Sequence, residues 1–331
     1  MSQLVTIFGG SGFVGRYITQ ALAHAGWRVR VAVRNPEEAG FVRTYGVVGQ
    51  VEPVFCNVRD DASVAGVLGG ADAVVNCVGI LAEKGKNTFT AVQAEAPGRI
   101  ARLAKADGVG RFVQISAIGA DAESASAYAR TKAKGEAAVQ EHYPDAVILR
   151  PSIVFGPEDD FFNRFAGMSR LGPVLPVVGA DTRFQPVYVE DVAAAALRAV
   201  TDPTVSGVYE LGGPDVDTFR ELMQHMLGFI NRQRLVANIP FFVAKPMAWG
   251  MGVAQTLSLG LFKAPLTTDQ VANLAEDNVV SEGAKGLSDL GIEATSLEAV
   301  LPDYLWRFRP SGQYDAIKAS AKNMRGRPDL N

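Results

Sequence analysis

The sequence predicts a doubly wound α/β fold, in which helices cover both faces of a parallel sheet, with a smaller α/β region toward the carboxyl terminus. Over the first half of the chain, runs of strand-forming residues alternate with helix-compatible runs, and no run repeats in tandem. The first strand leads directly into a group of spaced glycines. The composition, 48% hydrophobic and 20% charged over 331 residues, is that of a globular protein with a sizeable core.

The glycines at the start of the chain have the spacing of a nucleotide-binding turn. Residues 4–8 are strand formers, and Gly9, Gly12 and Gly15 follow at intervals of three. Gly9 suits a tight turn out of the strand, Gly12 allows a pyrophosphate to approach the backbone, and Gly15 lets the next helix lie against its strand. That helix, expected to end near Ala25, directs its free N–H groups at the phosphates. The pattern predicts a Rossmann-type dinucleotide site.

The remaining strands and helices follow in alternation. Strands are expected at residues 27–33, 51–58, 71–79 and 111–116, and helices at 89–106 and 128–141, with a further helix opening at 59–61. The run at 71–79 is almost entirely apolar, as a central parallel strand is. Later strands around 186–211 are expected to complete the sheet.

The end of the second strand indicates which nicotinamide cofactor is bound. Sites for the non-phosphorylated cofactor have an acidic residue there, which binds the ribose 2′-hydroxyl. This chain has Arg34 instead, and a guanidinium favours a 2′-phosphate by charge and by paired hydrogen bonds. Arg16, directly after the last glycine, is a second candidate for the same phosphate. The alternative is that both are solvated surface arginines, but the pattern favours NADP(H).

Two further strand ends are expected to face the cofactor, because ligands of such sheets bind outside the carboxyl ends of the strands. Asn57 and Val58 follow the third strand, where an adenine would lie. Residues 76–79 end the fourth strand on the same side.

Tyr128 and Lys132 stand four residues apart in an expected helix, which places both side chains on one face. A lysine beside a phenol is expected to lower the pKa of the phenol, so that the hydroxyl serves as a general acid or base. The same lysine is suited to bind the nicotinamide ribose. At this distance after a nucleotide-binding turn, the pair strongly indicates a site beside the nicotinamide end of the cofactor.

Composition and charge argue against several other classes of function. A net charge of −3 disfavours nucleic-acid binding. The three histidines, His24, His142 and His225, are far apart and lack ligands at metal-binding spacing, so no metal site is expected. Cys56 and Cys77 stand in apolar runs and are expected to be reduced and buried. No basic and apolar leader precedes the first strand, so no secretory signal is expected.

Taken together, the glycine turn, residues 76–79 and the Tyr128/Lys132 pair resemble the extended short-chain dehydrogenase/reductase superfamily. The runs at 149–157 and 187–193 belong to the same resemblance, which covers nearly the whole chain. Residues 150–159 followed by 161–166, and residues 184–189, are similar to an atypical branch of that superfamily: the nucleotide-binding accessory subunits of respiratory complex I, NADH:ubiquinone oxidoreductase.

This resemblance implies a protein that holds NADPH tightly as a structural ligand, away from the path of the electrons. It implies partners among the other subunits of respiratory complex I and a peripheral position on the cytoplasmic or matrix face of the energy-transducing membrane. The cofactor-binding residues that it implies are Gly9, Ser11, Gly12, Phe13, Val14, Gly15, Arg16, Arg34, Asn57, Val58, Asn76, Val78, Gly79, Ser116, Tyr128, Lys132, Pro151 and Ile153.

One departure from the superfamily concerns catalysis. Catalytic members carry a Ser or Thr just after the fifth strand, which hydrogen-bonds the reacting oxygen beside the tyrosine. Here Ala117 or Ile118 occupies that position, and Ser116 comes too early, facing the other side of the strand. Without the hydroxyl, hydride transfer is expected to be slow. No catalytic residue is therefore assigned, and Tyr128 and Lys132 are vestigial candidates.

Three units are expected: an NADP-binding domain at 1–155, a substrate-like or docking domain at 156–310, and a basic tail at 311–331 that orders on a partner. The tail carries Lys318, Lys322, Arg325 and Arg327. The apolar run at 247–262, with Trp249, Leu257, Leu259, Leu261 and Phe262, follows a Lys–Pro pair and is not expected to span a membrane. It has three interpretations: a buried lid helix, a partner-binding face, or a strip in the membrane interface, which would give peripheral membrane contact.

The sequence thus predicts a non-catalytic NADP(H)-binding accessory subunit of complex I, and it leaves open whether any enzymatic activity survives. A second hypothesis is a free-standing NADP-dependent reductase or epimerase with Tyr128 as acid/base. A third is a nucleotide-sensing regulator whose bound cofactor alters a partner interface.

Overall fold

The computed structural model describes residues 3–257, 266–312 and 314, without the side chains of 252–257. A parallel sheet of seven strands, in the order β11-β6-β5-β4-β1-β2-β3, forms its largest part. The strands are β1 (Leu4–Phe8), β2 (Arg28–Val33), β3 (Val51–Phe55), β4 (Ala73–Asn76), β5 (Arg111–Ile115), β6 (Val147–Pro151) and β11 (Gly207–Leu211). Every neighbouring pair is parallel. The predicted doubly wound α/β fold is confirmed.

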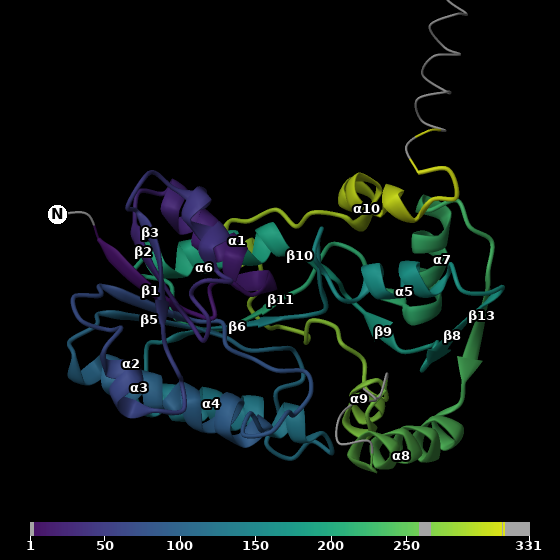
Figure 1. Cartoon of the computed structure of the whole chain (residues 1–331), viewed down its shortest axis with the longest axis horizontal. Helices are drawn as coiled ribbons and strands as arrows, with labels where there is room; N and C mark the ends of the chain where they lie inside the picture. The colour runs from purple at the N-terminus through teal and green to yellow at the C-terminus, as the bar shows by residue number, and fades with distance from the viewer. Residues whose placement is uncertain (1–2, 258–265, 313, 315–331) are drawn as a thin grey trace, which may run out of the picture.

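Helices cover both faces of this sheet (Figure 1). One face carries α1 (Phe13–His24) and α6 (Val189–Thr201), and the other carries α2 (Asp61–Ala65), α3 (Ala96–Ala106) and α4 (Ala127–His142). Successive strand residues point to opposite faces, so Ile7 joins the core under α1 and α6, whereas Phe8 joins the core under α3 and α4. Apolar strands buried on both faces are the reason that the sequence reads as continuous hydrophobic runs. A 3₁₀ segment, η1 (Gly40–Tyr45), follows β2.

The helix expected at 89–106 begins as a π-helical segment, η2 (Thr90–Glu95), before α3. Pro97 has no N–H to donate to the carbonyl of Gln93, which removes one α-helical hydrogen bond at this point. That carbonyl packs so closely on α4 that a Cβ at Gly135 would lie 2.1 Å from it. The sequence pattern located the helix but not its change of pitch.

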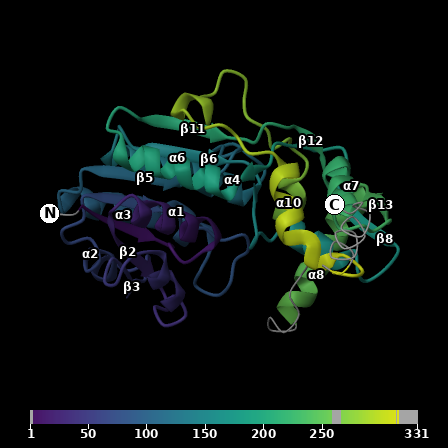
Figure 2. The ribbon, with the colours of Figure 1, turned by 90° about the horizontal axis from the view of Figure 1, so that it is seen from above.

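A second region lies at the carboxyl ends of the sheet strands (Figures 1 and 2). It contains α5 (Phe162–Met168), β8 (Val174–Val178), α7 (Phe219–Phe229), β13 (Leu235–Ile239), α8 (Phe241–Leu257), α9 (Thr268–Asn273), α10 (Leu297–Leu305) and η4 (Trp306–Phe308). Short ladders join β7 (Val154–Phe155) to β10 (Val187–Tyr188), and β9 (Arg183–Phe184) to β12 (Asp217–Thr218). A further 3₁₀ turn is η3 (Ser288–Leu290).

An aromatic cluster forms the core of the second region. Phe161 stacks on Phe219 at a centroid distance of 5.4 Å, and Phe165 and Phe184 meet Phe219 edge-on. Such pairs stabilise a core beyond the area that they bury. The second region therefore has its own hydrophobic centre, separate from the two cores of the sheet.

Helix α8 packs on the rest of the second region through small side chains. Ala244 and Ala248 are fully buried against Val178 and Val271, whereas Phe242 is 77% exposed and Trp249 is 68% exposed. Phe241 packs partly buried on the same cluster, but Phe242, Val243, Met247 and Trp249 face outward, so the interpretation of a buried lid helix is wrong for the described part of α8. Leu259, Leu261, Phe262 and the four basic tail residues lie outside the described residues, as does the side chain of Leu257. In the described part of the chain, no helix has the length and apolar character needed to cross a membrane.

Candidate nucleotide-binding site

The glycine turn between β1 and α1 has the geometry predicted for it. Gly9 has a φ of +76°, a conformation that side chains disfavour. Its carbonyl accepts a hydrogen bond from the Gly12 N–H, and a Cβ at Gly15 would lie only 2.3 Å from the same carbonyl oxygen. Gly9, through its positive φ, and Gly15, through this close approach, are therefore required by the backbone itself, independently of any ligand, whereas Gly12 has a φ of −69° that other residues adopt.

The turn also exposes the amino end of α1. Gly12 is the N-cap residue, no side chain caps the helix, and its first turn contains no acidic residue. The first N–H groups of the helix and its positive dipole end are thus available to an anion. Ser11, Phe13 and Val14 in this turn are all partly buried. A pyrophosphate fits this arrangement.

The two arginines proposed for a 2′-phosphate differ in their surroundings. Arg34 is exposed at the end of β2, and among the described residues it forms no hydrogen bond or ion pair. Arg16 lies 3.6 Å from the Glu158 carboxylate, and its guanidinium lies 5.0 Å above the ring of Phe41. Tyr17 donates a hydrogen bond of 2.7 Å to the same carboxylate. Arg34 is consequently the arginine with its donors available, while Arg16 connects α1 to the chain after β7.

The carboxyl ends of β3 and β4 present backbone to the site more than side chains. The Asn57 Oδ1 accepts hydrogen bonds from Arg59, and Val58 is half-buried. Asn76 is fully buried, donates to Gln114 at 2.9 Å and accepts from the Val78 N–H at 3.1 Å. These hydrogen bonds occupy the Asn76 amide, so this residue acts by shaping the loop at 77–79.

Lys132 is buried on α4 beside the end of β5. Its Nζ lies 3.4 Å from the Ile115 carbonyl oxygen and 5.8 Å from the centroid of the Tyr128 ring. Burial lowers the pKa of Lys132 to about 8, against the opposing effects of Glu136 and Cys77. A buried ammonium with one long hydrogen bond has donors left for the hydroxyls of a ribose.

Tyr128 does not have the lowered pKa that its spacing from Lys132 suggested. Burial, and then the charge of Asp269, raise its pKa to about 12. The expectation was wrong because the Lys132 Nζ lies over the ring, 5.8 Å from its centroid, and burial and Asp269 decide the direction of the shift. In this structure Tyr128 is a poor general base near neutral pH.

Asp269 is a residue of this site that the sequence analysis missed. It comes from α9 in the second region, and it accepts hydrogen bonds from the Ser126 hydroxyl at 3.1 Å and the Ala127 N–H at 2.7 Å. Its carboxylate therefore caps the positive end of α4, whose first turn contains Tyr128. The capping pattern at Thr267 and Gln270 predicted that a helix starts here, but nothing in the sequence indicated which part of the fold it touches.

The Ser116 side chain is the one at this site that is least stabilised by hydrogen bonds. It is 4% exposed, and its Oγ is the one buried side-chain polar atom without a hydrogen-bond partner among the described residues. A buried hydroxyl without a partner costs free energy, which a bound ligand can recover. Ala117 and Ile118 follow it, and neither side chain carries a hydroxyl.

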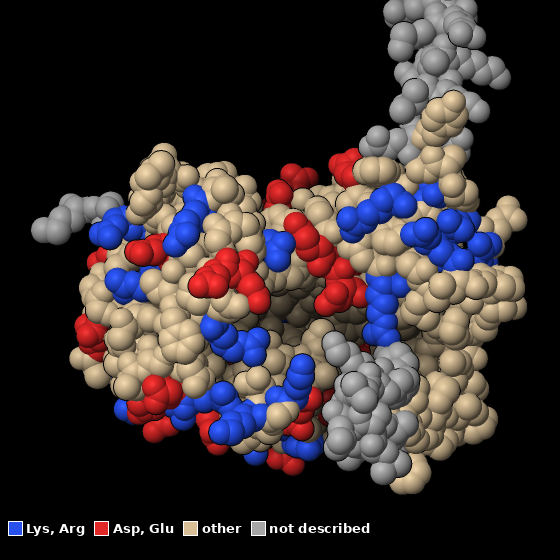
Figure 3. Space-filling view, in the orientation of Figure 1, with Lys and Arg blue, Asp and Glu red and all other residues tan. Residues whose placement is uncertain are grey.

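Pro151 and Ile153 lie where β6 ends. The Pro151 carbonyl accepts a hydrogen bond from the Ile118 N–H at 3.0 Å, which joins the loops after β5 and β6, and Ile153 packs partly buried on the aromatic core. Gln93, which was not predicted, links Ile80 to Thr131 on α4. The predicted positions thus surround the carboxyl edge of the sheet, and Figure 3 shows the surface hollowed between this edge and the second region. Among the described residues, no group of metal-binding side chains is present.

A parallel sheet with this strand order, a glycine turn opening α1 and a Tyr–Lys pair on α4 define a dinucleotide-binding α/β protein of the short-chain dehydrogenase/reductase type. Comparison with known families makes this specific. The profile of the NAD dependent epimerase/dehydratase family matches residues 5–212, and the chain belongs to this family.

Individual relatives extend the match beyond the sheet. The chain is 34% identical over 320 residues to the NADH dehydrogenase [ubiquinone] 1 alpha subcomplex subunit 9, mitochondrial, of Arabidopsis thaliana, covering 93% of this chain and 79% of the plant protein. It is 33% identical over 230 residues to a ceramide reductase of Caulobacter vibrioides, covering 68% of this chain and 71% of that enzyme. The fold is similar to that of an Escherichia coli NADPH-dependent quinone oxidoreductase complexed with NADPH, with a TM-score of 0.69 and 19% identity, covering 91% of this chain and 98% of that chain.

Proposed function

We propose that this protein is an accessory, non-catalytic subunit of NADH:ubiquinone oxidoreductase that binds NADP(H) tightly and contributes to the assembly and stability of the peripheral arm near the membrane. The observation that carries the proposal is the similarity to the plant complex I subunit over 93% of this chain, which includes the second region as well as the sheet. A match confined to the sheet would support nucleotide binding alone.

The geometry around Tyr128 supports a binding role over a catalytic one. Its raised pKa, near 12, disfavours proton exchange at neutral pH, and Ala117 offers no hydroxyl to polarise a carbonyl. Lys132 and the exposed end of α1 retain what is needed to hold a ribose and a pyrophosphate. The nicotinamide ring, when bound, supplies the capacity to carry a hydride, but these residues do not assist its transfer.

The proposal of NADP(H) rests on Arg34. Its exposed guanidinium, at the end of β2, lies where a cofactor of this fold presents the 2′ position of its adenosine ribose. An unpaired cation at that point favours a phosphate over a hydroxyl.

The exposed side of α8 supports attachment to a larger assembly. Phe242, Val243, Met247 and Trp249 are all more than a third exposed, and large apolar side chains gathered on one helix are typical of a contact surface. Other subunits, or the membrane interface next to them, would cover this surface in a peripheral position on the cytoplasmic or matrix side.

A free-standing NADP-dependent reductase or epimerase remains the second candidate. The similarity to the Caulobacter ceramide reductase favours it, since that relative is named as an enzyme. The two candidates differ in one measurable property, which is turnover of a carbonyl substrate with NADPH.

The deciding experiment is to tag the chain in its own cell, extract the membranes in mild detergent and identify the proteins that co-purify. Recovery with the flavin- and iron–sulfur-containing subunits of the quinone reductase, together with NADP(H) released on denaturation, is the expected result. Recovery alone in the soluble fraction would contradict the proposal, and carbonyl substrates would then be screened with NADPH.

A further inference from the structure

The second region carries a set of arginines that the nucleotide site does not use. Five of them are distributed over the segment after α5, the loop before β13 and the end of α10 with η4: Arg170, Arg232, Arg234, Arg307 and Arg309. In Figure 3 basic side chains gather over this part of the molecule, near α7 and α10. No lysine occurs between residues 135 and 244 or between 286 and 317, so this surface is built from arginine alone.

Hydrogen bonds bring these separate segments together. The Nε of Arg232 donates to the Phe308 carbonyl at 2.9 Å, which places it between Arg307 and Arg309. The pKa of Arg232 is lowered by burial and then by the nearby charges of Arg234 and Arg170. The five residues therefore form one surface, which we call the arginine surface.

Several of these guanidinium groups are held in place by backbone. Arg234 donates from Nε to the Ser169 carbonyl at 2.8 Å, and Arg309 donates from Nε to the Phe229 carbonyl at 2.8 Å. A guanidinium has five N–H donors, so an anchored group keeps others to offer. Holding the group in advance lowers the entropy cost of binding a partner.

Among the described residues, no carboxylate forms an ion pair with the arginine surface. The arginine–carboxylate pairs of the described residues involve Arg16, Arg99, Arg102, Arg150, Arg183 and Arg198. None of these belongs to the arginine surface, whose described partners are carbonyl and amide oxygens. Five positive charges held close together, without an ion-paired carboxylate in the described part of the chain, repel one another and favour an anionic partner.

Apolar side chains project beside these charges. Leu171 is 88% exposed next to Arg170, and Leu235 is 67% exposed next to Arg234. Leu235 also pairs in register with Val174, which is 44% exposed, across the two-stranded ladder of β8 and β13. Arginine and large apolar residues without lysine are the composition of protein–protein contact surfaces, where arginine is enriched and lysine depleted.

We propose that the arginine surface docks on an acidic face of a partner protein, with Leu171 and Leu235 entering apolar positions among the carboxylates. Backbone-anchored arginines fit a rigid array of carboxylates, which they bind in pairs of hydrogen bonds, better than they fit a fluid lipid surface. The proposal rests on the proposed function for the existence of a protein partner, and it assigns the surface and the chemistry of the contact.

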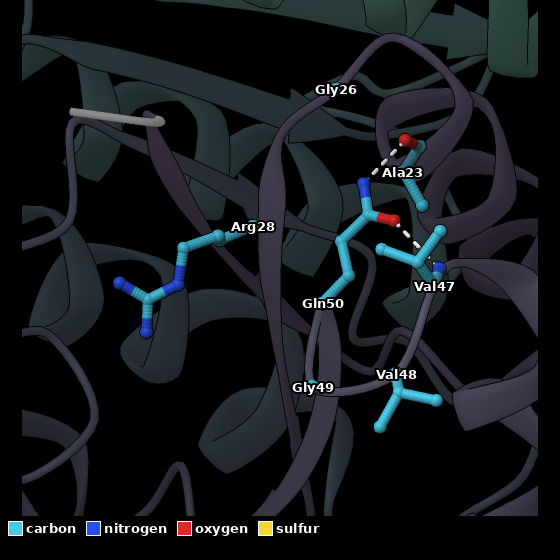
Figure 4. A pocket seen from close by; sticks show the side chains of 7 residues that line it. All are labelled: Ala23, Gly26, Arg28, Val47, Val48, Gly49 and Gln50. Carbon is cyan, nitrogen blue, oxygen red and sulfur yellow. Dashed lines mark hydrogen bonds between the residues drawn. The ribbon is translucent and has the colours of Figure 1, made fainter.

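Photo-crosslinking in living cells tests this assignment. A photoreactive phenylalanine analogue replaces Leu171 or Leu235 in the full chain, and the linked peptide is identified by mass spectrometry. Val48 provides the control position, because it is fully exposed on the far side of the sheet, beside a shallow depression whose lining contains a single charged residue, Arg28 (Figure 4). Adducts with an Asp- and Glu-rich segment of another protein from positions 171 and 235, and not from 48, are expected.

A charge reversal then tests the role of the arginines. Arg170→Glu removes an exposed side chain for which the structure shows no hydrogen bond, and Arg28→Glu makes the same change on the control surface. We expect the adduct yield from position 235 to fall several-fold with Arg170→Glu and to stay unchanged with Arg28→Glu. Equal yields in the two variants would overturn the assignment.

The remaining outcomes separate this inference from the proposed function. Adducts only with a second copy of this chain, adducts only with lipid, or no adducts at all overturn the acidic-protein assignment, even if the chain co-purifies with complex I. Lipid adducts would be followed by sedimentation with vesicles of phosphatidylcholine and phosphatidylglycerol. Adducts with an acidic protein that is not a complex I subunit uphold the arginine surface and contradict the proposed function.

Discussion

Helices α1 and α8 bury opposite kinds of side chain. In α1, Ile18 and Leu22 are fully buried against the sheet, and the polar end of the helix is left open at the glycine turn. In α8, the small residues Ala244 and Ala248 are buried, and Phe242 and Trp249 face outward. The sheet therefore satisfies its apolar surface internally and offers backbone N–H groups to a small ligand, whereas the second region leaves apolar and cationic surface for something larger.

The largest effect is expected from a side chain introduced into the glycine turn. Gly15→Val places atoms against the Gly9 carbonyl, where even a Cβ would lie at 2.3 Å, and we expect a loss of about 3 kcal/mol in the free energy of unfolding together with loss of NADPH binding. Denaturant titration and calorimetry measure the two effects. The matched control is Gly228→Ala in α7, where a Cβ meets nothing within 4 Å and helix propensity improves. Retained NADPH binding in Gly15→Val would contradict the role of this turn as the binding site of the small ligand.

Burial of Lys132 makes the stability of the folded chain depend on pH, and the sign of that dependence follows from the pKa of Lys132. The pKa of Lys132 is about 8 in the folded chain against its ordinary value of 10.5, so between these pH values the unfolded chain binds more protons. The contribution of Lys132 to stability therefore rises with pH, by about 3 kcal/mol at most from pH 8 to 10.5. Below pH 8 the full cost of burying its charge is present.

Urea unfolding of the nucleotide-free protein at both ends of this window checks that sign. Lys132→Met is expected to abolish the contribution of Lys132 to the increase in unfolding free energy with pH. Lys134 is exposed on the same helix, so Lys134→Met is expected to retain that contribution. Titration of other groups is common to both variants and cancels in their difference. Parallel pH profiles for the two variants would show that Lys132 is not buried as a cation.

Substitution of Arg34, at the end of β2, tests whether the site prefers NADPH to NADH. Arg34→Ala is expected to lower the ratio of NADPH to NADH affinity about tenfold, since a charged hydrogen bond contributes about 1.5–3 kcal/mol. Arg16→Ala is expected to change the ratio less, because Glu158 and Phe41 already engage its guanidinium. Calorimetric titration with each nucleotide measures the ratio. If neither substitution alters it, the preference for the phosphorylated cofactor has another origin.

The smallest effect on stability is expected in α8. Phe242→Ser and Trp249→Ser are each expected to change the free energy of unfolding of the isolated chain by no more than about 0.5 kcal/mol, because both side chains are already in water. The same variants are expected to lower recovery of the chain with the membrane-extracted complex. Ala248→Asp, at a buried position of the same helix, should destabilise the chain and serves as the contrast. Unchanged recovery of the Phe242 and Trp249 variants would show that the exposed side of α8 does not contact the complex.

Local sequence patterns predicted the turn after β1 and the end of β2 well. Gly9 is required by its own positive φ and Gly15 by its close approach to Gly9 and Gly10, and such short-range constraints are visible in the spacing of the residues. The pairing of Tyr128 with Lys132 was equally accessible, since both lie on one helix. The pKa of Tyr128 was not, because burial and Asp269, from a segment 141 residues away, outweigh the lysine.

The alternation of strands and helices was sufficient to specify the class of fold, because a parallel sheet covered on both faces imposes a periodicity that each segment carries by itself. Which face of α8 is outside, and which arginines share one surface, depended on packing between segments far apart in the chain. Arg232 meets Phe308 across 76 residues, and Asp269 meets Ala127 across 142. Long-range contacts of this kind leave no periodic pattern in a sequence, since the pattern around each residue reflects the secondary structure of its own segment and not its distant partner.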